Sequence, residues 1–259
     1  MTPDELYARI RAKRSCLCVG LDTDPAKLPQ GLDVLAFNKA IIDATAPYCV
    51  AFKPNLAFYE AMGLEGWRIL GQTVDYLRSR CPDQFLIADA KRGDIGNTAK
   101  KYAETFFGSF DFDAVTLSPY MGRETVEPFL QYPGRYAIVV ALSSNRSAAD
   151  FQYADNGGKP LYQSVMEQCM EISSPDNMMF VVGATKADRL REIRAFCPEN
   201  FLLVPGVGAQ GGSAEEVIAA GANSRCGLLI NSSRGILYAS SGPDFAEKAA
   251  AAAAATARL

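Results

Sequence analysis

The sequence contains no histidine among its 259 residues. This absence excludes Ser-His-Asp and Cys-His catalysis, and it excludes any metal site with a histidine ligand. Proton transfer would therefore fall to Asp, Glu, Lys, Tyr or Cys side chains. The sequence also lacks an apolar run of about 18 residues, the length that a membrane-spanning helix needs. We therefore expect no membrane association.

A strong excess of charge of one sign is also missing. The formal net charge is −3, and no basic face is evident, so nucleic acid is not an expected partner. The first six residues do not have the pattern of a signal peptide, and we expect a cytoplasmic protein. The seven cysteines are scattered without a C-x-x-C pair. We interpret most of them as small buried hydrophobic residues in a reducing compartment.

Eight short apolar runs recur along the chain, with helix-like stretches between them. Their length and their Val, Ile, Leu and Phe content suit strands that are buried on both faces. The runs cover residues 16–21, 48–53, 85–91, 114–117, 137–142, 178–183, 202–205 and 227–230. The helix-like stretches include residues 33–46, 66–80, 98–107, 186–196 and 214–220. This alternation predicts a single α/β domain over residues 1–259, a (β/α)8 TIM barrel, with a doubly wound open sheet as the alternative.

Two further segments bear on the architecture. Residues 143–159 form the longest irregular piece and follow a predicted strand. They are either a lid over the active face of the barrel or a tolerated surface insertion. Seven consecutive alanines at positions 249–255 predict a terminal helix that closes the outer ring.

Charged residues stand at the ends of three successive predicted strands. Asp22 follows the first strand, Lys53 ends the second, and Asp89 and Lys91 lie on the third. Residues i and i+2 of a strand point to the same face, so Asp89 and Lys91 should lie side by side. Strand ends converge at one mouth of a barrel, where alternating charges would keep each lysine protonated between carboxylates. We predict a functional cluster with a proton donor, to which Asp94 adds a nearby carboxylate.

A second group of residues follows the last two predicted strands. Residues 204–213 are rich in glycine and lead into a helix, and residues 231–234 add the guanidinium of Arg234. Free backbone N–H groups and a guanidinium suit an anion, and barrel phosphate sites are commonly built from these two loops. The pattern therefore predicts a phosphate site.

These motifs resemble those of one family. Residues 89–98 resemble the D-x-K-x-x-D-I-G-x-T signature of orotidine 5′-monophosphate decarboxylases, and residues 205–212 are similar to their phosphate loop. Residues 52–60 resemble a longer bacterial branch of that family. The resemblance runs from residues 21–22 to residues 233–234 in the family's motif order. It implies decarboxylation of orotidine 5′-monophosphate to uridine 5′-monophosphate in pyrimidine biosynthesis, on a TIM barrel without a metal or other cofactor.

The resemblance also implies roles for the charged residues. Lys91 would stabilise the carbanion that forms at C6 of the pyrimidine and then protonate it. Asp89 would lie beside the substrate carboxylate, Lys53 would join Asp89 and the ribose, and Asp22 would accept from a ribose hydroxyl. By family analogy, Asp94 and Thr98 would reach into the neighbouring subunit's site. A homodimer with two shared sites would follow.

The remaining substrate contacts follow from the same resemblance. Pro205 belongs to the phosphate loop, and Gln210 and Arg234 match the positions that grip the phosphate. Ser233 precedes Arg234 where the family often has glycine, so the local backbone contact to phosphate can differ. Ser144 resembles the serine that meets the pyrimidine amide, and its neighbour Ser143 is the open alternative.

Two other functions compete with this interpretation. Sugar-phosphate decarboxylases and aldolase-like synthases share the barrel and the D-x-K-x-x-D strand, but they resemble metal enzymes with an acidic magnesium ligand at the end of the second strand. This chain has Lys53 there, which would repel a cation. A phosphate-binding barrel without catalysis is the second competitor. Such a protein has no need to keep the five charged residues of the cluster, namely Asp22, Lys53, Asp89, Lys91 and Asp94.

Overall fold

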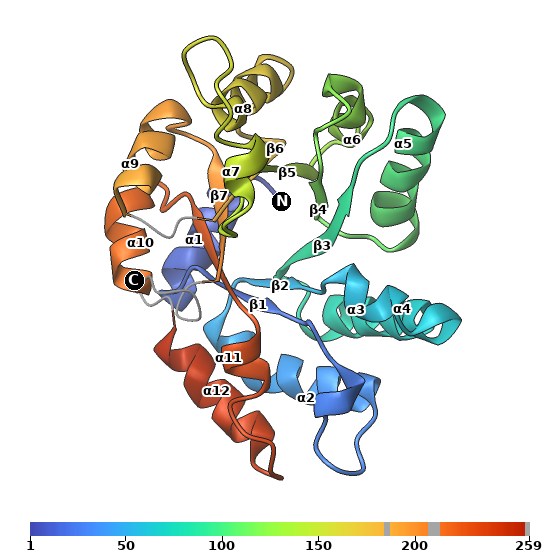
Figure 1. Ribbon diagram of the computed structural model, residues 1–259. Helices are drawn as coiled ribbons and strands as arrows, with labels where there is room; N and C mark the ends of the chain where they lie inside the picture. Colours follow the sequence, from blue (N-terminus) through green and yellow to red (C-terminus); the bar gives the residue numbers. More distant parts are fainter. Residues whose placement is uncertain (184–186, 207–212, 257–259) are drawn as a thin grey trace.

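Eight parallel strands close into a barrel in the computed structural model, which describes residues 1–183, 187–206 and 213–256 (Figure 1). Each strand pairs with the next along the chain, and the last pairs with the first. The predicted TIM barrel is therefore confirmed, and the doubly wound open sheet is wrong. The strands are β1 (Leu17–Gly20), β2 (Ala51–Lys53), β3 (Phe85–Arg92), β4 (Ala114–Leu117), β5 (Tyr136–Leu142), β6 (Met178–Val182), β7 (Phe201–Pro205) and β8 (Leu228–Ser232).

Each of the eight predicted apolar runs overlaps one of these strands, although the bounds differ by up to three residues. Every residue of β1, β2, β4 and β6 is buried, because the helices cover the outer face of the barrel and neighbouring side chains fill its interior. A strand buried on both faces needs an unbroken apolar run rather than an alternating one. This is why composition alone located the strands.

Helices surround the barrel and connect its strands. They are α1 (Pro3–Lys13), α2 (Val34–Thr45), α3 (Leu56–Glu60), α4 (Gly63–Arg80), α5 (Gly96–Ala103), α6 (Glu127–Leu130), α7 (Ala148–Phe151), α8 (Leu161–Glu171), α9 (Ala187–Phe196), α10 (Ala214–Gly221), α11 (Arg234–Leu237) and α12 (Phe245–Ala255). The helix predicted over residues 98–107 is divided into α5 and a π-helical turn, Glu104–Ser109. The predicted stretch 186–196 corresponds to α9, and its first residue lies outside the described residues.

Helix α12 confirms the terminal helix that the alanine run predicts. It begins four residues before that run, and Phe245 packs on Phe37 of α2 with ring centroids 5.1 Å apart. Helix α1 was not among the predicted helices. Its signal is a capping box, in which the Thr2 hydroxyl accepts from the Glu5 backbone N–H and the Glu5 carboxylate accepts from the Thr2 N–H.

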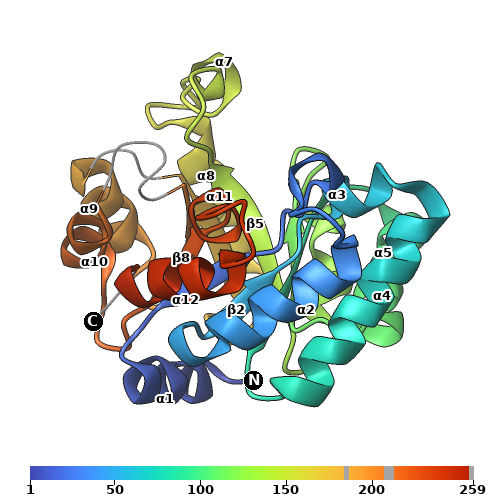
Figure 2. The ribbon, with the colours of Figure 1, turned by 90° about the horizontal axis from the view of Figure 1, so that it is seen from below.

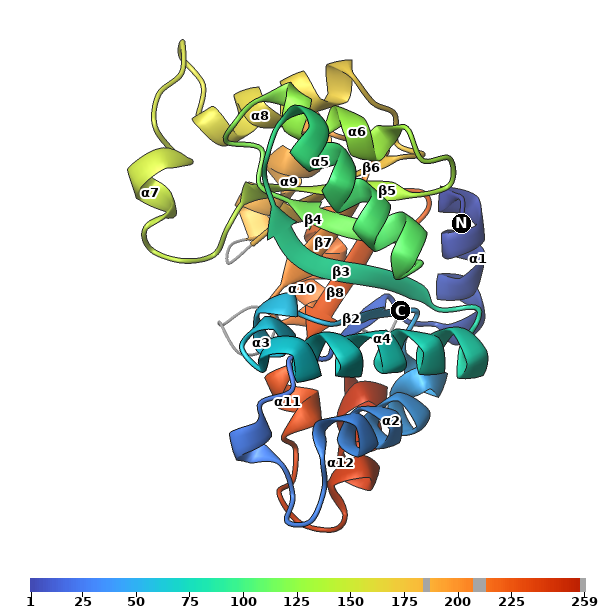
Figure 3. The same ribbon diagram turned by 90° about the vertical axis from the view of Figure 1, so that its right-hand side faces the viewer.

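The segment 143–159 projects away from the barrel and carries the short helix α7, as Figures 2 and 3 show from two directions. Phe151 on α7 is exposed. The segment follows β5 at the carboxyl end of the barrel, where a lid would have to stand. Closure of this segment over the site stays a prediction.

The seven cysteines, all of them among the described residues, form no disulfide, and six of them are buried. Burial in apolar surroundings raises the pKa of the Cys169 thiol to about 11. These features confirm the interpretation of the cysteines as small hydrophobic residues. Within the described ranges, no helix is both long and apolar enough to cross a membrane.

Candidate active site

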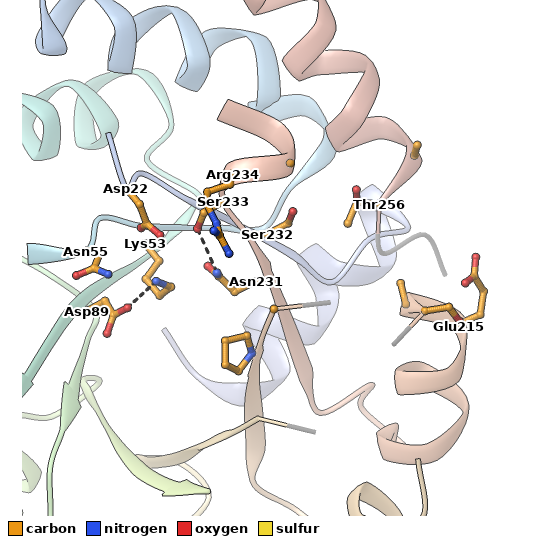
Figure 4. Close-up of a pocket in the computed structure, with 16 residues that line it drawn as sticks. Asp22, Lys53, Asn55, Asp89, Glu215, Asn231, Ser232, Ser233, Arg234 and Thr256 are labelled. Carbon is orange, nitrogen blue, oxygen red and sulfur yellow. Dashed lines mark hydrogen bonds and ion pairs between the residues drawn. The ribbon is translucent and has the colours of Figure 1, made fainter. Parts of the chain in front are cut away.

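A cavity of about 640 Å³ opens at the carboxyl ends of the strands. Its floor comes from β2, β3, β7 and β8 and from Asp22 after β1, and it extends outward between α10 and the end of α12 (Figure 4). Polar side chains dominate its inner part. The described lining residues named in the figure are Asp22, Lys53, Asn55, Asp89, Glu215, Asn231, Ser232, Ser233, Arg234 and Thr256.

Asp89 lies between two lysine ammonium groups at the base of this mouth. Its Oδ2 is 2.7 Å from Lys53 Nζ, and its Oδ1 is 2.5 Å from Lys91 Nζ. The side chains of Asp89 and Lys53 are buried, whereas that of Lys91 is 53% exposed. The predicted convergence of these residues is therefore confirmed. The expectation that each lysine lies between carboxylates is wrong for Lys91, whose ammonium contacts only Asp89 within the described part of the chain.

The contact between Asp89 and Lys91 does not come from regular strand alternation. The pairing of β3 with β4 shifts between Ala88 and Arg92, and Lys91 has a left-handed backbone with φ of 45°. The contact that i and i+2 positions predict is therefore present, but the backbone that makes it is not a regular strand. A bulge re-aims a side chain relative to a regular strand, and here it brings the lysine over the carboxylate.

Electrostatics keep this pair of buried residues ionised. Burial alone would raise the pKa of Asp89, but the Lys53 and Lys91 ammonium groups outweigh burial and hold that pKa well below its usual range. Burial alone would lower the pKa of Lys53, but the Asp89 and Asp22 carboxylates outweigh it and raise that pKa. Each buried charge is therefore stabilised by its partners.

Asp22 follows β1 and faces Lys53 across the mouth (Figure 4). Its Oδ1 is buried and has no hydrogen-bond partner among the described residues. The loop that carries it is fixed from behind, because the Tyr238 hydroxyl donates to the Asp22 carbonyl at 3.2 Å and the Tyr59 hydroxyl donates to the Leu21 carbonyl at 3.2 Å. A buried acceptor without a donor, on a fixed loop, is suited to a ligand hydroxyl.

A buried polar network supports the same loop. The Asn38 amide donates to the Tyr59 hydroxyl at 3.0 Å and to the Thr73 hydroxyl at 3.1 Å, and its Oδ1 accepts from the Thr23 hydroxyl at 2.6 Å. Reasoning from the sequence missed this network. No local pattern marks it, because its members come from α2, α3, α4 and the loop after β1.

Arg234 and Ser233 also line the cavity, with Pro205 and Gly206 at the end of β7. Arg234 is exposed, and its guanidinium makes no hydrogen bond or ion pair within the part of the chain that the structure describes. Ser233 rests on β1, where a Cβ on Gly20 would lie 1.8 Å from its Oγ. The absence of a side chain at Gly20 thus leaves room for the Ser233 side chain. The predicted phosphate residue Gln210 lies outside the described residues.

The two candidate serines differ in their hydrogen bonds. The Ser143 hydroxyl donates to Asn145 Oδ1 at 2.6 Å and accepts from Gln152 Nε2 at 2.8 Å. The Ser144 hydroxyl has no such partner within the described residues. A Cβ on Gly183 would lie 2.4 Å from the Ser144 backbone nitrogen, so only glycine allows the end of β6 to approach this turn. Ser143 therefore holds the loop together, and Ser144 is left able to bond a ligand.

Asp94 and Thr98 do not join the cavity of their own chain. The Asp94 Oδ1 accepts from the Ile95 backbone N–H at 2.8 Å, and Thr98 is exposed on α5. Ile95, Tyr120 and Met121 are exposed on the adjoining loops after β3 and β4. The two loops touch, because a Cβ on Gly93 would lie 2.7 Å from the Ser118 carbonyl oxygen.

Two further polar residues that the sequence did not single out face the charged array. Thr116 lies on β4, and its hydroxyl donates to Asp89 Oδ1 at 3.0 Å. Asn231 lies on β8 and lines the cavity, and its buried Oδ1 has no partner among the described residues. The signals that could have found them are a polar residue inside the run 114–117 and another directly after the run 227–230.

Comparisons with known proteins agree on one family. A sequence model described as "Orotidine 5'-phosphate decarboxylase / HUMPS family" matches residues 15–250. A protein of Christiangramia forsetii named orotidine 5'-phosphate decarboxylase is 55% identical over 258 residues, covering 98% of this chain and 95% of its own length. One of the same name from Porphyromonas gingivalis is 54% identical, covering 100% and 96%. The structure of Leishmania donovani OMP decarboxylase superimposes with a TM-score of 0.81 at 34% identity, covering 99% of this chain and 100% of that one.

Proposed function

This chain belongs to the orotidine 5′-phosphate decarboxylase / HUMPS family, and we propose that it converts orotidine 5′-monophosphate to uridine 5′-monophosphate and CO2 without a cofactor. The reaction would be the last step of uridine 5′-monophosphate synthesis. One observation carries the proposal. The Asp89 carboxylate, held between two ammonium groups, and the side chain of Arg234 line the same cavity.

The chemistry requires a cation placed in advance. Loss of CO2 leaves an electron pair at C6 of the pyrimidine, a position with no ordinary electron sink. An ammonium fixed beside that atom stabilises charge that exists only in the transition state, which lowers the barrier more than binding the substrate would. Lys91 supplies this ammonium from the exposed side of the array. Its Nζ then gives a proton to C6, and the lysine regains a proton from solvent.

Asp89 and Lys53 support Lys91. The Asp89 carboxylate holds the Lys91 ammonium at 2.5 Å and would lie beside the carboxylate of the substrate. Two carboxylates at close range repel each other, and the departure of one as CO2 relieves that repulsion. Lys53 balances the charge of Asp89 from the buried side, and both Lys53 and the unpartnered Oδ1 of Asp22 are available to ribose hydroxyls.

The phosphate end supplies binding energy remote from the reacting ring. Arg234, with Pro205 and Ser233 beside it in the cavity wall, offers an unpaired guanidinium at the place that the resemblance predicts for the phosphate. Gln210 would complete this grip from the loop after β7. The Ser144 hydroxyl, which has no hydrogen-bond partner among the described residues, would bond the pyrimidine amide. Binding energy from the phosphate can orient the ring over Lys91.

We further propose a homodimer with shared sites. Asp94 and Thr98 lie outside the cavity of their own chain, while Ile95, Tyr120 and Met121 expose apolar surface beside them. Exposed large apolar side chains gathered on adjoining loops are typical of protein interfaces. Pairing through these loops would bring Asp94 and Thr98 to the partner's array, in an enzyme of the cytoplasm.

The donor set argues against the sugar-phosphate enzymes that share this barrel. Those enzymes resemble metal proteins with an acidic ligand at the end of the second strand, where this chain has Lys53. Lys53 and Lys91 together surround the one carboxylate of β3 that faces the cavity. Two ammonium groups within bonding distance of a carboxylate compete with a divalent cation for it.

The proposal is tested by incubating the purified protein with orotidine 5′-monophosphate. The ultraviolet absorbance of the orotate ring should fall, with one CO2 released for each uridine 5′-monophosphate formed. Binding of both nucleotides without turnover would favour the non-catalytic phosphate-binding barrel. Turnover of a sugar phosphate only in the presence of a divalent metal would favour the competing enzyme class.

A further inference from the structure

Thr116 contacts both Asp89 and Lys91 of β3 through one hydroxyl group. Its Oγ1 donates to Asp89 Oδ1 at 3.0 Å and accepts from the Lys91 backbone N–H at 3.0 Å. The residue is 1% exposed, in the middle of β4. The hydroxyl proton is thus used on Asp89, and a lone pair of the same oxygen is used on Lys91.

The irregular pairing of β3 and β4 explains why a side chain is needed here. Ala88 pairs with Val115 and Arg92 pairs with Leu117, so Asp89, Ala90 and Lys91 face Thr116 alone. A regular parallel strand would satisfy the Lys91 N–H with a carbonyl of its neighbour. At this bulge the Thr116 hydroxyl takes the place of that carbonyl.

Lys91 has a backbone conformation that requires such support. A φ of 45° places it in the left-handed region, which is strained for a residue with a Cβ. Such conformations persist only when the surroundings determine them. The N–H bond to Thr116 and the ammonium bond to Asp89 hold the two ends of this residue.

We propose that Thr116 is a positioning residue, whose hydroxyl sets the Lys91 ammonium and the Asp89 carboxylate in their reacting arrangement. The inference rests on the proposed function of the same site. Thr116 acts through Lys91, and Lys91 acts on charge that develops in the transition state. Loss of the hydroxyl therefore lowers kcat and leaves nucleotide binding nearly intact.

The test compares three variants with the wild-type protein. Thr116→Val keeps the shape and removes the hydroxyl, and Thr116→Ser keeps the hydroxyl. Thr45→Val is the matched control, since Thr45 is fully buried and its hydroxyl donates to the Ile41 carbonyl inside α2, away from the site. We expect kcat to fall about 10–100-fold in Thr116→Val, as is typical when the support of an active-site residue is lost. The uridine 5′-monophosphate dissociation constant should change by less than about threefold, and Thr116→Ser should restore kcat to within about threefold.

Hydrogen exchange of the Lys91 amide provides a second measurement that does not depend on activity. Exchange should be faster in Thr116→Val and unchanged in Thr116→Ser and Thr45→Val. If wild-type protein does not turn over orotidine 5′-monophosphate, the proposed function fails, and the exchange measurement still decides whether Thr116 holds Lys91. The inference is overturned if Thr116→Val keeps the wild-type kcat and exchange rate. It is equally overturned if serine fails to rescue and both Thr116 variants lose kcat and nucleotide binding together.

Discussion

The Lys91 ammonium lies 2.5 Å from Asp89 Oδ1, and it reaches that oxygen from a left-handed backbone at the end of β3. The other oxygen of the carboxylate accepts from buried Lys53. Hydrogen bonds to charged groups contribute about 1.5–3 kcal/mol each, and a buried carboxylate left with no such partner is strongly destabilised. The exposed Lys91 ammonium is thus held in place by the buried ion pair of Asp89 and Lys53.

Arg234→Ala should lower kcat/KM about 100-fold, because a guanidinium–phosphate contact contributes about 1.5–3 kcal/mol and each 1.4 kcal/mol is tenfold. The control is Arg68→Ala, which removes an exposed arginine paired with Glu65 on α4. Steady-state kinetics on orotidine 5′-monophosphate and on phosphate-free orotidine measure the effect. Arg234→Ala and wild type should act on orotidine equally. A loss of the same size on both substrates would contradict the phosphate assignment.

Ser144→Ala and Ser143→Ala should separate the roles of the paired serines. The Ser144 hydroxyl is unpaired among the described residues, and its removal should lower kcat/KM about tenfold while the melting temperature stays unchanged. Ser143 bonds Asn145 and Gln152, so its removal should mainly loosen the segment 143–159. Kinetics and limited proteolysis of that segment measure the two effects. Full activity in Ser144→Ala would instead leave Ser143 as the pyrimidine contact.

Mixtures of Lys91→Ala and Asp94→Ala protein should recover activity that neither variant has alone. In a hybrid dimer with shared sites, one site carries both substitutions and the other carries none. Random exchange of subunits should therefore restore about a quarter of the wild-type specific activity. Subunit exchange is verified by differently tagged chains. Confirmed exchange without recovered activity would show that Asp94 does not serve the partner's site.

Asp89→Asn should change how stability depends on pH. Burial alone would raise the pKa of Asp89 in the folded protein. Lys53 and Lys91 outweigh burial and hold that pKa below its usual range. Below the unfolded pKa of about 3.9, the unfolded chain binds a proton that the folded chain does not. The stability that Asp89 contributes is thus complete above that pH and is lost as pH falls toward the folded pKa.

Urea unfolding at pH 6 and at pH 3.5 measures this contribution. Wild type should lose more free energy of unfolding between the two pH values than Asp89→Asn does. At pH 6 the variant should be less stable by about 3 kcal/mol, because two ammonium groups lose their shared carboxylate. Asp83→Asn, which removes an exposed carboxylate, is the control. An equal loss of stability in wild type and Asp89→Asn would contradict the ionised, paired state of Asp89.

The sequence predicts this fold well because parallel strands buried on both faces need unbroken apolar runs. The runs at residues 114–117 and 178–183 therefore located β4 and β6 without further information. The charged residues at strand ends were found for the same reason, since a charge after such a run stands out. Their convergence then follows from the geometry of a barrel.

What the sequence could not predict depends on contacts between distant segments. At the shift in strand register between Ala88 and Arg92, the Thr116 hydroxyl accepts from the Lys91 backbone N–H, and nothing near residue 91 in the sequence marks that partner. The support of the Asp22 loop by Asn38 and Tyr59 likewise joins separate elements. The difference in hydrogen bonding between Ser143 and Ser144 depends on Gln152, which lies next to Ser143 only in the folded loop.

The account is tested most directly by the turnover of orotidine 5′-monophosphate in chelator-treated wild type and in Lys91→Ala, with Lys101→Ala as the surface-lysine control. The treated wild type and the control should keep full activity. Lys91→Ala should be slower by about 10³-fold or more while it still binds uridine 5′-monophosphate, because the proton donor and the fixed cation are both lost. A near-normal kcat in Lys91→Ala, or activity of wild type that returns only with added divalent metal, would contradict the account.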